Sequence, residues 1–207
     1  MDIGNWCKWL LESKEEKKKL AIEALKIPRR SSLYAPDMLA KRPSRGDQLL
    51  HILRSTLFHF DASGYQRSYH QRLFHDSMTA ACIRHIYKDE FAGNFLKILE
   101  ENNWSDARQE VMICCPRRFG KTWATAMFVM AYVWAIPNSE VCIFSPSRRQ
   151  SEKMLELIST MMDKIPGARK HVCKSNRERL WFKIGLTDIR KISSYPSKVT
   201  TLKGTSR

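Results

Sequence analysis

Apolar residues recur at helical spacing through the middle of the chain, from Gln48 to Leu99. Residues three or four positions apart lie on one face of an α-helix, so this spacing predicts amphipathic helices. Three sets of positions define three expected helices: Leu49, Leu50, Leu53 and Leu57; Leu73, Met78, Ala81, Cys82 and Ile86; and the run from Phe91 to Leu99. We therefore expect residues 48–104 to be helical.

The first 47 residues follow a different pattern. Residues 5–27 have the spacing of an amphipathic helix with Trp6 and Trp9 on its apolar side, and Pro28 is expected to end it. Residues 28–47 are rich in proline, serine and charge, which is typical of a linker or an exposed segment. This part of the chain is therefore predicted to be a helix followed by a linker.

Strand patterns appear only after residue 105. Four short runs have strand character: 111–115, 141–145, 179–184 and 188–193. The run 141–145 is apolar as far as Phe144 and predicts a buried strand, whereas the last two runs meet at Gly185 and predict a hairpin.

Two helices are expected between these strands. Residues 123–136 carry no charge and predict a helix buried against a sheet, and a second helix follows Pro146 and ends near Gly167. The order strand, loop, helix, strand, helix predicts an α/β fold whose parallel sheet is covered by helices over residues 105–207.

The uncharged run 123–136 is too short to span a membrane, and the charged N-terminus does not resemble a secretory signal. The six cysteines include no C-x-x-C pair, so a zinc ribbon is not expected, and a reducing compartment fits. We therefore expect an intracellular protein that is neither secreted nor membrane-bound.

The formal net charge is +15, and the excess lies mainly at the C-terminal end. Residues 141–207 hold 15 Lys and Arg against 5 Asp and Glu, whereas residues 51–110 hold 7 against 8. Such an excess favours contact with a polyanion such as nucleic acid, although an ordinary solvated surface or a subunit contact has the same composition. Nine side chains are expected to form this surface: Arg148, Arg149, Lys174, Arg177, Arg179, Arg190, Lys191, Lys198 and Lys203.

The most specific chemical pattern runs from Pro116 to Thr122, with the sequence PRRFGKT between an expected strand and an expected helix. This order is the architecture of a phosphate-binding loop, in which the amides at the start of the helix face the phosphates. Gly120 permits close approach of the backbone, Lys121 suits the β- and γ-phosphates, and the Thr122 hydroxyl suits Mg²⁺. Arg117 and Arg118 add guanidinium groups that bind phosphate oxygens. The usual first glycine is replaced by Cys115, and a chance surface turn is the alternative interpretation.

The segment from Pro116 to Trp123 resembles the Walker A motif of terminase large subunits, most closely the herpesvirus-type core P-R-R-x-G-K-T-W, and phage terminases have similar arginine-bearing loops. The segment from Ile143 to Gln150 resembles the second strand and following helix of the same ATPase domain. The resemblance implies a P-loop NTPase of the ASCE type with a mostly parallel sheet, here incomplete and preceded by a helical extension. It covers roughly residues 105–207.

Terminase large subunits hydrolyse ATP to drive double-stranded viral DNA into capsids. The resemblance implies that Lys121 contacts the γ-phosphate, that Thr122 ligates Mg²⁺, and that Arg117 or Arg118 is linked to hydrolysis. It implies a glutamine that reads adenine, for which Gln66 and Gln71 are candidates, with Gln71 preferred. The full expected nucleotide site is Pro116, Arg117, Arg118, Phe119, Gly120, Lys121, Thr122 and Gln71.

The same resemblance implies ATP and Mg²⁺ as cofactors, and double-stranded DNA, a portal and a small terminase subunit as partners. It also implies a homo-oligomeric ring and a location in the host nucleus or a cytoplasmic virus factory.

ATP hydrolysis also needs acidic residues that hold the metal and position water. No apolar run that ends in Asp-Glu or Glu-Glu follows the loop, and the acidic cluster of a nuclease domain is missing from the sequence. We therefore expect an N-terminal portion of a terminase-like ATPase that binds a nucleotide but turns it over poorly by itself. A helicase-like ATPase and a basic DNA-binding module with a vestigial loop are the alternatives.

Overall fold

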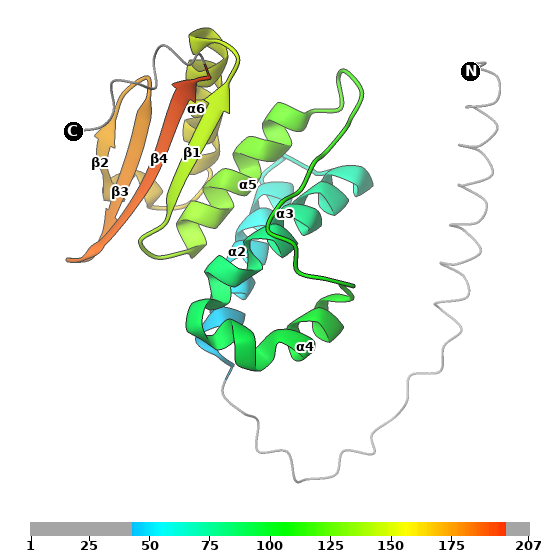
Figure 1. The fold of residues 1–207 in the computed structure, drawn as a ribbon. Helices are drawn as coiled ribbons and strands as arrows, with labels where there is room; N and C mark the ends of the chain where they lie inside the picture. Colours follow the sequence, from blue (N-terminus) through cyan, green and yellow to red (C-terminus); the bar gives the residue numbers. More distant parts are fainter. Residues whose placement is uncertain (1–42, 198–207) are drawn as a thin grey trace, which may run out of the picture. The chain divides into compact units, whose positions relative to one another are not determined.

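The computed structural model describes residues 43–197, and five α-helices and four strands are formed there (Figure 1). The helices are α2 (Arg45–Ala62), α3 (Tyr69–Tyr87), α4 (Phe91–Asn102), α5 (Lys121–Ala135) and α6 (Arg148–Met162), and the 3₁₀-helices are η1 (Lys88–Glu90) and η2 (Ala168–His171). The strands are β1 (Glu140–Ser145), β2 (Val172–Ser175), β3 (Arg179–Ile184) and β4 (Asp188–Pro196). The helix expected over residues 5–27, and the linker as far as residue 42, lie outside the described residues.

The three helices expected between residues 48 and 104 are confirmed as α2, α3 and α4. Two of them begin with a capping box, in which a serine side chain and a residue three positions later satisfy each other's backbone amides. Ser44 pairs with Asp47 at the start of α2, and Ser68 pairs with Gln71 at the start of α3. The first residues of α2 and α3 are therefore determined by hydrogen bonds between residues that are close in the sequence.

The sheet is mixed, with the strand order β1-β4-β3-β2. Among the strands of residues 43–197, only β1 and β4 are parallel, whereas β3 is antiparallel to both β4 and β2. The expectation of a mostly parallel sheet is therefore wrong. The short connections between β2, β3 and β4 force antiparallel pairing, since a parallel pair needs a crossover of a dozen or more residues. The hairpin at Gly185, with a φ of 74°, is confirmed.

The strand expected at 111–115 is not formed. These residues lie in the connection between α4 and α5, and Met112 is 89% exposed. A strand is defined by hydrogen bonds to a neighbour, and among residues 43–197 this segment pairs with no strand of the sheet. An apolar run before a helix was therefore not sufficient to predict a strand.

Strand β1 forms as expected but is not buried. Its side chains alternate between exposed and half-buried up to Ser145, and Phe144 is 56% exposed. The reason is that α5 and α6 cover one face of the sheet, and no helix of the described part of the chain covers the other (Figure 1).

Helix α5 lies at the centre of the core, between α2 and α3 on one side and the sheet on the other (Figure 1). Ala126, Met130, Ala131 and Val133 are fully buried along it, so the predicted core helix is confirmed. One hydrophobic cluster joins its side chains to those of α2, α3, α6 and β3. Across residues 43–197, no helix combines the length and hydropathy needed to cross a bilayer.

Candidate functional site

The candidate site is the turn from Pro116 to Gly120 and the helix start that follows it. Gly120 takes the N-cap position of α5 with a φ of 81°, and Arg118 also has a positive φ, of 65°. Positive φ is readily adopted by glycine but is uncommon for arginine. The two left-handed residues turn the chain sharply, so that α5 begins at Lys121.

Within residues 43–197, the first turn of α5 is uncapped and exposed to solvent. No side chain caps this helix within the described structure, and Lys121 and Thr122 are exposed at its first two positions. The side chains of Arg117, Arg118 and Lys121 are not engaged in ion pairs with residues 43–197. Uncapped amides, the positive end of the helix dipole and three unpaired cations therefore meet at one place.

Gln71 contacts the back of this turn. Its Nε2 donates a hydrogen bond of 3.1 Å to the carbonyl oxygen of Phe119, while its Oε1 accepts one of 2.9 Å from the amide of Ser68. A Cβ atom at Gly120 would lie 2.7 Å from Gln71 Nε2. Gln71 thus joins the start of α3 to the turn, whereas Gln66 is exposed in the connection between α2 and α3. Neither arrangement tests which glutamine reads adenine, and the preference for Gln71 stays a prediction.

A buried polar network of α2, α3 and their connection contacts the first turn of α5. Nε2 of His75 lies 2.7 Å from the carbonyl oxygen of Ala124, and Nδ1 lies 2.9 Å from Nη1 of Arg67. Since a guanidinium can only donate, Nδ1 accepts and Nε2 carries the proton that is donated to Ala124. Arg67 in turn makes a two-pronged ion pair with Asp61, with contacts of 3.0 and 2.8 Å.

Burial and the charge of Arg67 set the protonation states of His75 and Asp61 in this network. Burial lowers the pKa of His75 to about 4, helped by the nearby Arg67, so the ring is neutral at pH 7. Burial alone would raise the pKa of Asp61, but the hydrogen bonds and charge of Arg67 outweigh it and hold that pKa below its usual value. The support of α5 therefore contains one neutral ring and one paired charge.

Two aromatic side chains hold the connection between α2 and α3 against the same helix turn. The rings of Tyr65 and Trp123 stack with centroids 5.4 Å apart and an angle of 26°. Lys164 Nζ lies 5.5 Å from the centroid of Tyr65. Trp123, the last residue of the motif, therefore packs against the connection that also holds Arg67.

The opposite end of α5 is held by Arg190 of β4. Its guanidinium donates hydrogen bonds to the carbonyl oxygens of Val133, at 3.0 Å, and of Trp134. Asp188 pairs with the same guanidinium at 2.6 Å. A cation at the carboxyl end of a helix satisfies free carbonyls and complements the dipole. Arg190 is therefore structural, and its expected place on a basic surface is wrong because the side chain is buried.

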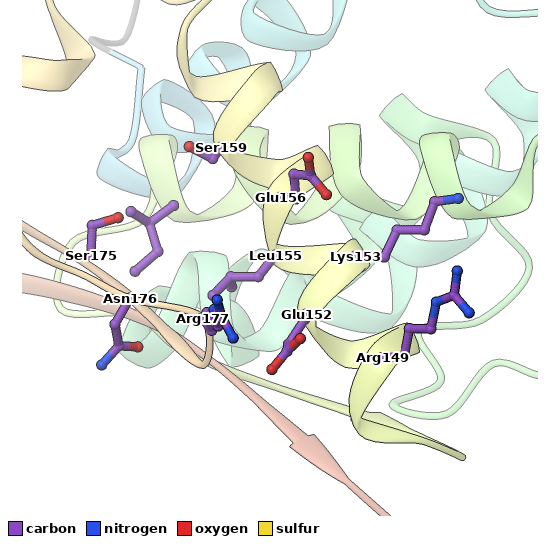
Figure 2. A pocket seen from close by; sticks show the side chains of 10 residues that line it. Arg149, Glu152, Lys153, Leu155, Glu156, Ser159, Ser175, Asn176 and Arg177 are labelled. Atoms are coloured by element: carbon purple, nitrogen blue, oxygen red, sulfur yellow. The ribbon is translucent and has the colours of Figure 1, made fainter.

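A cavity of about 630 Å³ lies between α6 and the turn that joins β2 to β3 (Figure 2). Arg149, Lys153 and Arg177 line it together with Glu152 and Glu156. No residue of the turn 116–122 lines this cavity. Its mixed charges do not favour a polyanion as strongly as the helix start does.

The other expected cations are divided among several places. Arg148 pairs with Glu152 at 3.1 Å and with Glu178 at 3.4 Å. Lys174, Arg179 and Lys191 gather on the sheet face that α5 and α6 do not cover, around the ring of Trp181. Lys198 and Lys203 lie outside the described residues.

Sequence analysis did not identify the residues that support the loop, namely Asp61, Arg67 and His75. They lie in a stretch whose main sequence signal is its apolar spacing, and His75 contacts Ala124 across 49 positions. A histidine among apolar positions of a helix was the one available signal. It does not reveal its partner, since the contact depends on how α3 packs against α5.

No protein-family model matches this chain, and comparison with characterised proteins finds no similar sequence.

Proposed function

We propose that the turn 116–122 and the first turn of α5 bind the phosphates of ATP, as the nucleotide-binding portion of a terminase-like motor that packages double-stranded viral DNA. The observation that carries the proposal is the uncapped start of α5 beside three unpaired cations. Helix-start amides without a capping side chain, next to cations without an acidic partner, form the arrangement that binds anions at helix N-termini.

Each residue of the turn has a different role in the proposed binding of phosphates. Gly120 allows the tight turn from which the amides of α5 start, because a side chain there would both strain the backbone and meet Gln71 at the back of the turn. Lys121 brings a point charge to the terminal phosphates, and Arg117 and Arg118 bring planar guanidiniums that bind two oxygens at once.

Thr122 fits the expected role of holding Mg²⁺, because it is exposed at the second position of the helix, beside the phosphate site. No group of three or more His, Cys, Asp or Glu side chains in the described part of the chain is arranged to hold a metal. The ion would therefore be shared between the hydroxyl and the nucleotide, where it neutralises phosphate charge.

The motif supports the more specific part of the proposal. The sequence from Pro116 to Trp123 resembles the herpesvirus-type terminase loop, and this resemblance is the basis for proposing a P-loop fold, duplex DNA, a ring and the partners of a packaging machine. The geometry of the helix start and its arginines, taken without the motif, supports phosphate binding alone.

The experiment is a titration of the full chain with a fluorescent ATP analogue in the presence of Mg²⁺. We expect the Lys121→Ala variant to bind at least tenfold more weakly, since one charge-assisted phosphate contact is worth about 1.5–3 kcal/mol. Lys153→Ala is the matched control, because it removes an exposed lysine of α6 that does not belong to the turn. Equal affinity of Lys121→Ala and the unmodified chain would exclude the site.

A further inference from the structure

The face of the sheet that lies opposite α5 and α6 carries aromatic and cationic side chains. The register places Trp181 of β3 between Lys174 of β2 and Lys191 of β4, and all three share that face. Further along the sheet, Tyr195 of β4 is paired with Phe144 of β1. We call this surface the open sheet face.

Trp181 is surrounded by positive charge. The Nζ atoms of Lys174 and Lys191 lie 4.5 and 5.3 Å from its ring centroid, and the guanidinium carbon of Arg179 lies 5.9 Å away. Lys183 projects from the same face of β3 as Trp181, two positions further along the strand. Four cations therefore occupy this face, and the acidic side chain among them is Glu140, which lies 3.8 Å from Lys191.

The second aromatic group leaves a ring surface open. Phe144 and Tyr195 stack on each other with centroids 5.8 Å apart, and Phe144 remains 56% exposed. Tyr195 is half-buried, so the exposed ring of Phe144 is the surface on which another flat group can stack. Tyr195 lies four positions beyond Lys191 along β4, which is about 13 Å of strand.

We propose that the open sheet face binds single-stranded nucleic acid, with unpaired bases stacked on Phe144 and Tyr195 and phosphates beside Lys174, Arg179 and Lys191. Single strands are recognised by this combination of aromatic platform and cationic track. A duplex keeps its bases stacked on one another, so it gains from the cations but not from the rings. The proposal goes beyond nucleotide binding at the turn 116–122 and does not depend on it.

The N-terminal part of the chain is a less suitable occupant on charge. Residues 1–42 hold ten Lys and Arg against six Asp and Glu, so they share the positive sign of the open sheet face. Like charges disfavour that contact, whereas a polyanion is favoured by every cation around Trp181.

The experiment measures fluorescence anisotropy of a labelled oligothymidylate of about 20 nucleotides with the full chain, without ATP, from about 50 to 200 mM salt. We expect binding that weakens with salt, with a slope of log K against log salt of about −2 to −3 for four neutralised phosphates. Replacing Lys174 and Lys191 together with alanine should reduce the magnitude of that slope by about 1.4, which is about 0.7 for each lost phosphate contact.

Phe144→Ala tests the stacking, and we expect affinity to fall about tenfold at constant salt slope. Phe144→Tyr keeps a ring and should restore binding. The matched controls are Phe58→Ala, which removes a 71% exposed ring of α2, and Lys170→Ala, which removes an exposed lysine of η2; both should bind as the unmodified chain does.

Three results would overturn the proposal. One is a duplex of the same length binding as tightly as the single strand, with Phe144→Ala having no effect, which would indicate a general polyanion surface. Another is the absence of salt-dependent binding, which would leave the face to a protein partner or to another segment of this protein. The third is an equal loss of binding in Phe58→Ala and Phe144→Ala.

Discussion

Nε2 of His75 donates a hydrogen bond of 2.7 Å to the carbonyl oxygen of Ala124, and this contact joins α3 to the first turn of α5. The same ring accepts a hydrogen bond from Arg67, so its two nitrogens have opposite roles. A protonated ring would have two donors, and the second would face a guanidinium. Protonation therefore opposes the folded arrangement.

This arrangement predicts a pH-dependent stability. The pKa of His75 is about 4 in the folded protein and about 6.5 in an unfolded chain, so between these values the unfolded state binds more protons. The free energy of unfolding should therefore rise as pH increases from 4 to 6.5, by at most about 3 kcal/mol, and then level off. Urea denaturation at a series of pH values measures this change in the free energy of unfolding.

His75→Gln serves as the reference for that measurement, because its amide is neutral at every pH in the window. The variant should show a smaller rise between pH 4 and 6.5 than the unmodified chain. Equal slopes would mean that another group titrates in this range.

The ion pair of Arg67 and Asp61 should be essential to stability. Both side chains are about nine-tenths buried, so Asp61→Asn leaves a buried guanidinium without its counter-charge. We expect the free energy of unfolding to fall by about 3 kcal/mol. The control is Asp106→Asn. Asp106 forms an exposed ion pair with Arg108, with a distance of 3.2 Å between Oδ2 and Nε, so this change should alter stability by less than about 1 kcal/mol. Similar losses in the two variants would contradict the assigned role.

Gly120→Ala should weaken nucleotide binding and also destabilise the chain by about 1–2 kcal/mol, because its φ is 81° and the new Cβ would meet Gln71. Gly64→Ala is the matched control, since Gly64 also has a positive φ but nothing lies within 4 Å of a Cβ there. Both variants should lose stability, but only Gly120→Ala should lose affinity for ATP. Unchanged ATP affinity in Gly120→Ala would contradict a phosphate site at this turn.

Arg190→Met should destabilise the chain by about 3 kcal/mol, because it leaves Asp188 without a counter-charge and the carbonyl of Val133 without a donor. Lys191→Met changes the next residue on the opposite face of β4 and should cost less than about 1 kcal/mol, since its ion pair with Glu140 is solvent-exposed. Thermal unfolding of both variants compares them directly. A smaller loss in Arg190→Met than in Lys191→Met would contradict the capping role.

The sequence predicted those features that local chemistry determines. Apolar spacing was sufficient for α2, α3 and α4, because each buries one face and two begin at a serine cap. Gly185 marked the hairpin because the turn needs a positive φ. Residues 116–122 are contiguous in the sequence, so they could be predicted to lie close together without knowledge of the tertiary structure.

Features that depend on partners distant in sequence were missed or wrong. Strand β2 has four residues and no clear pattern, and it exists because β3 lies beside it. The run 111–115 has a strand composition but no neighbour to pair with in residues 43–197. Arg190 looks like any surface cation in the sequence, and its burial follows from the position of the end of α5.

Strand β1 has consequences for handling the purified protein. Within the described chain it pairs only with β4, so the peptide groups along its outer side have no strand partner. An unpaired edge strand of this kind can hydrogen-bond to strands of neighbouring molecules, and Phe144 adds an exposed apolar side chain beside it. Concentrated samples are therefore expected to form intermolecular β-structure from this edge first, and a lysine introduced at Cys142 should delay the onset of turbidity.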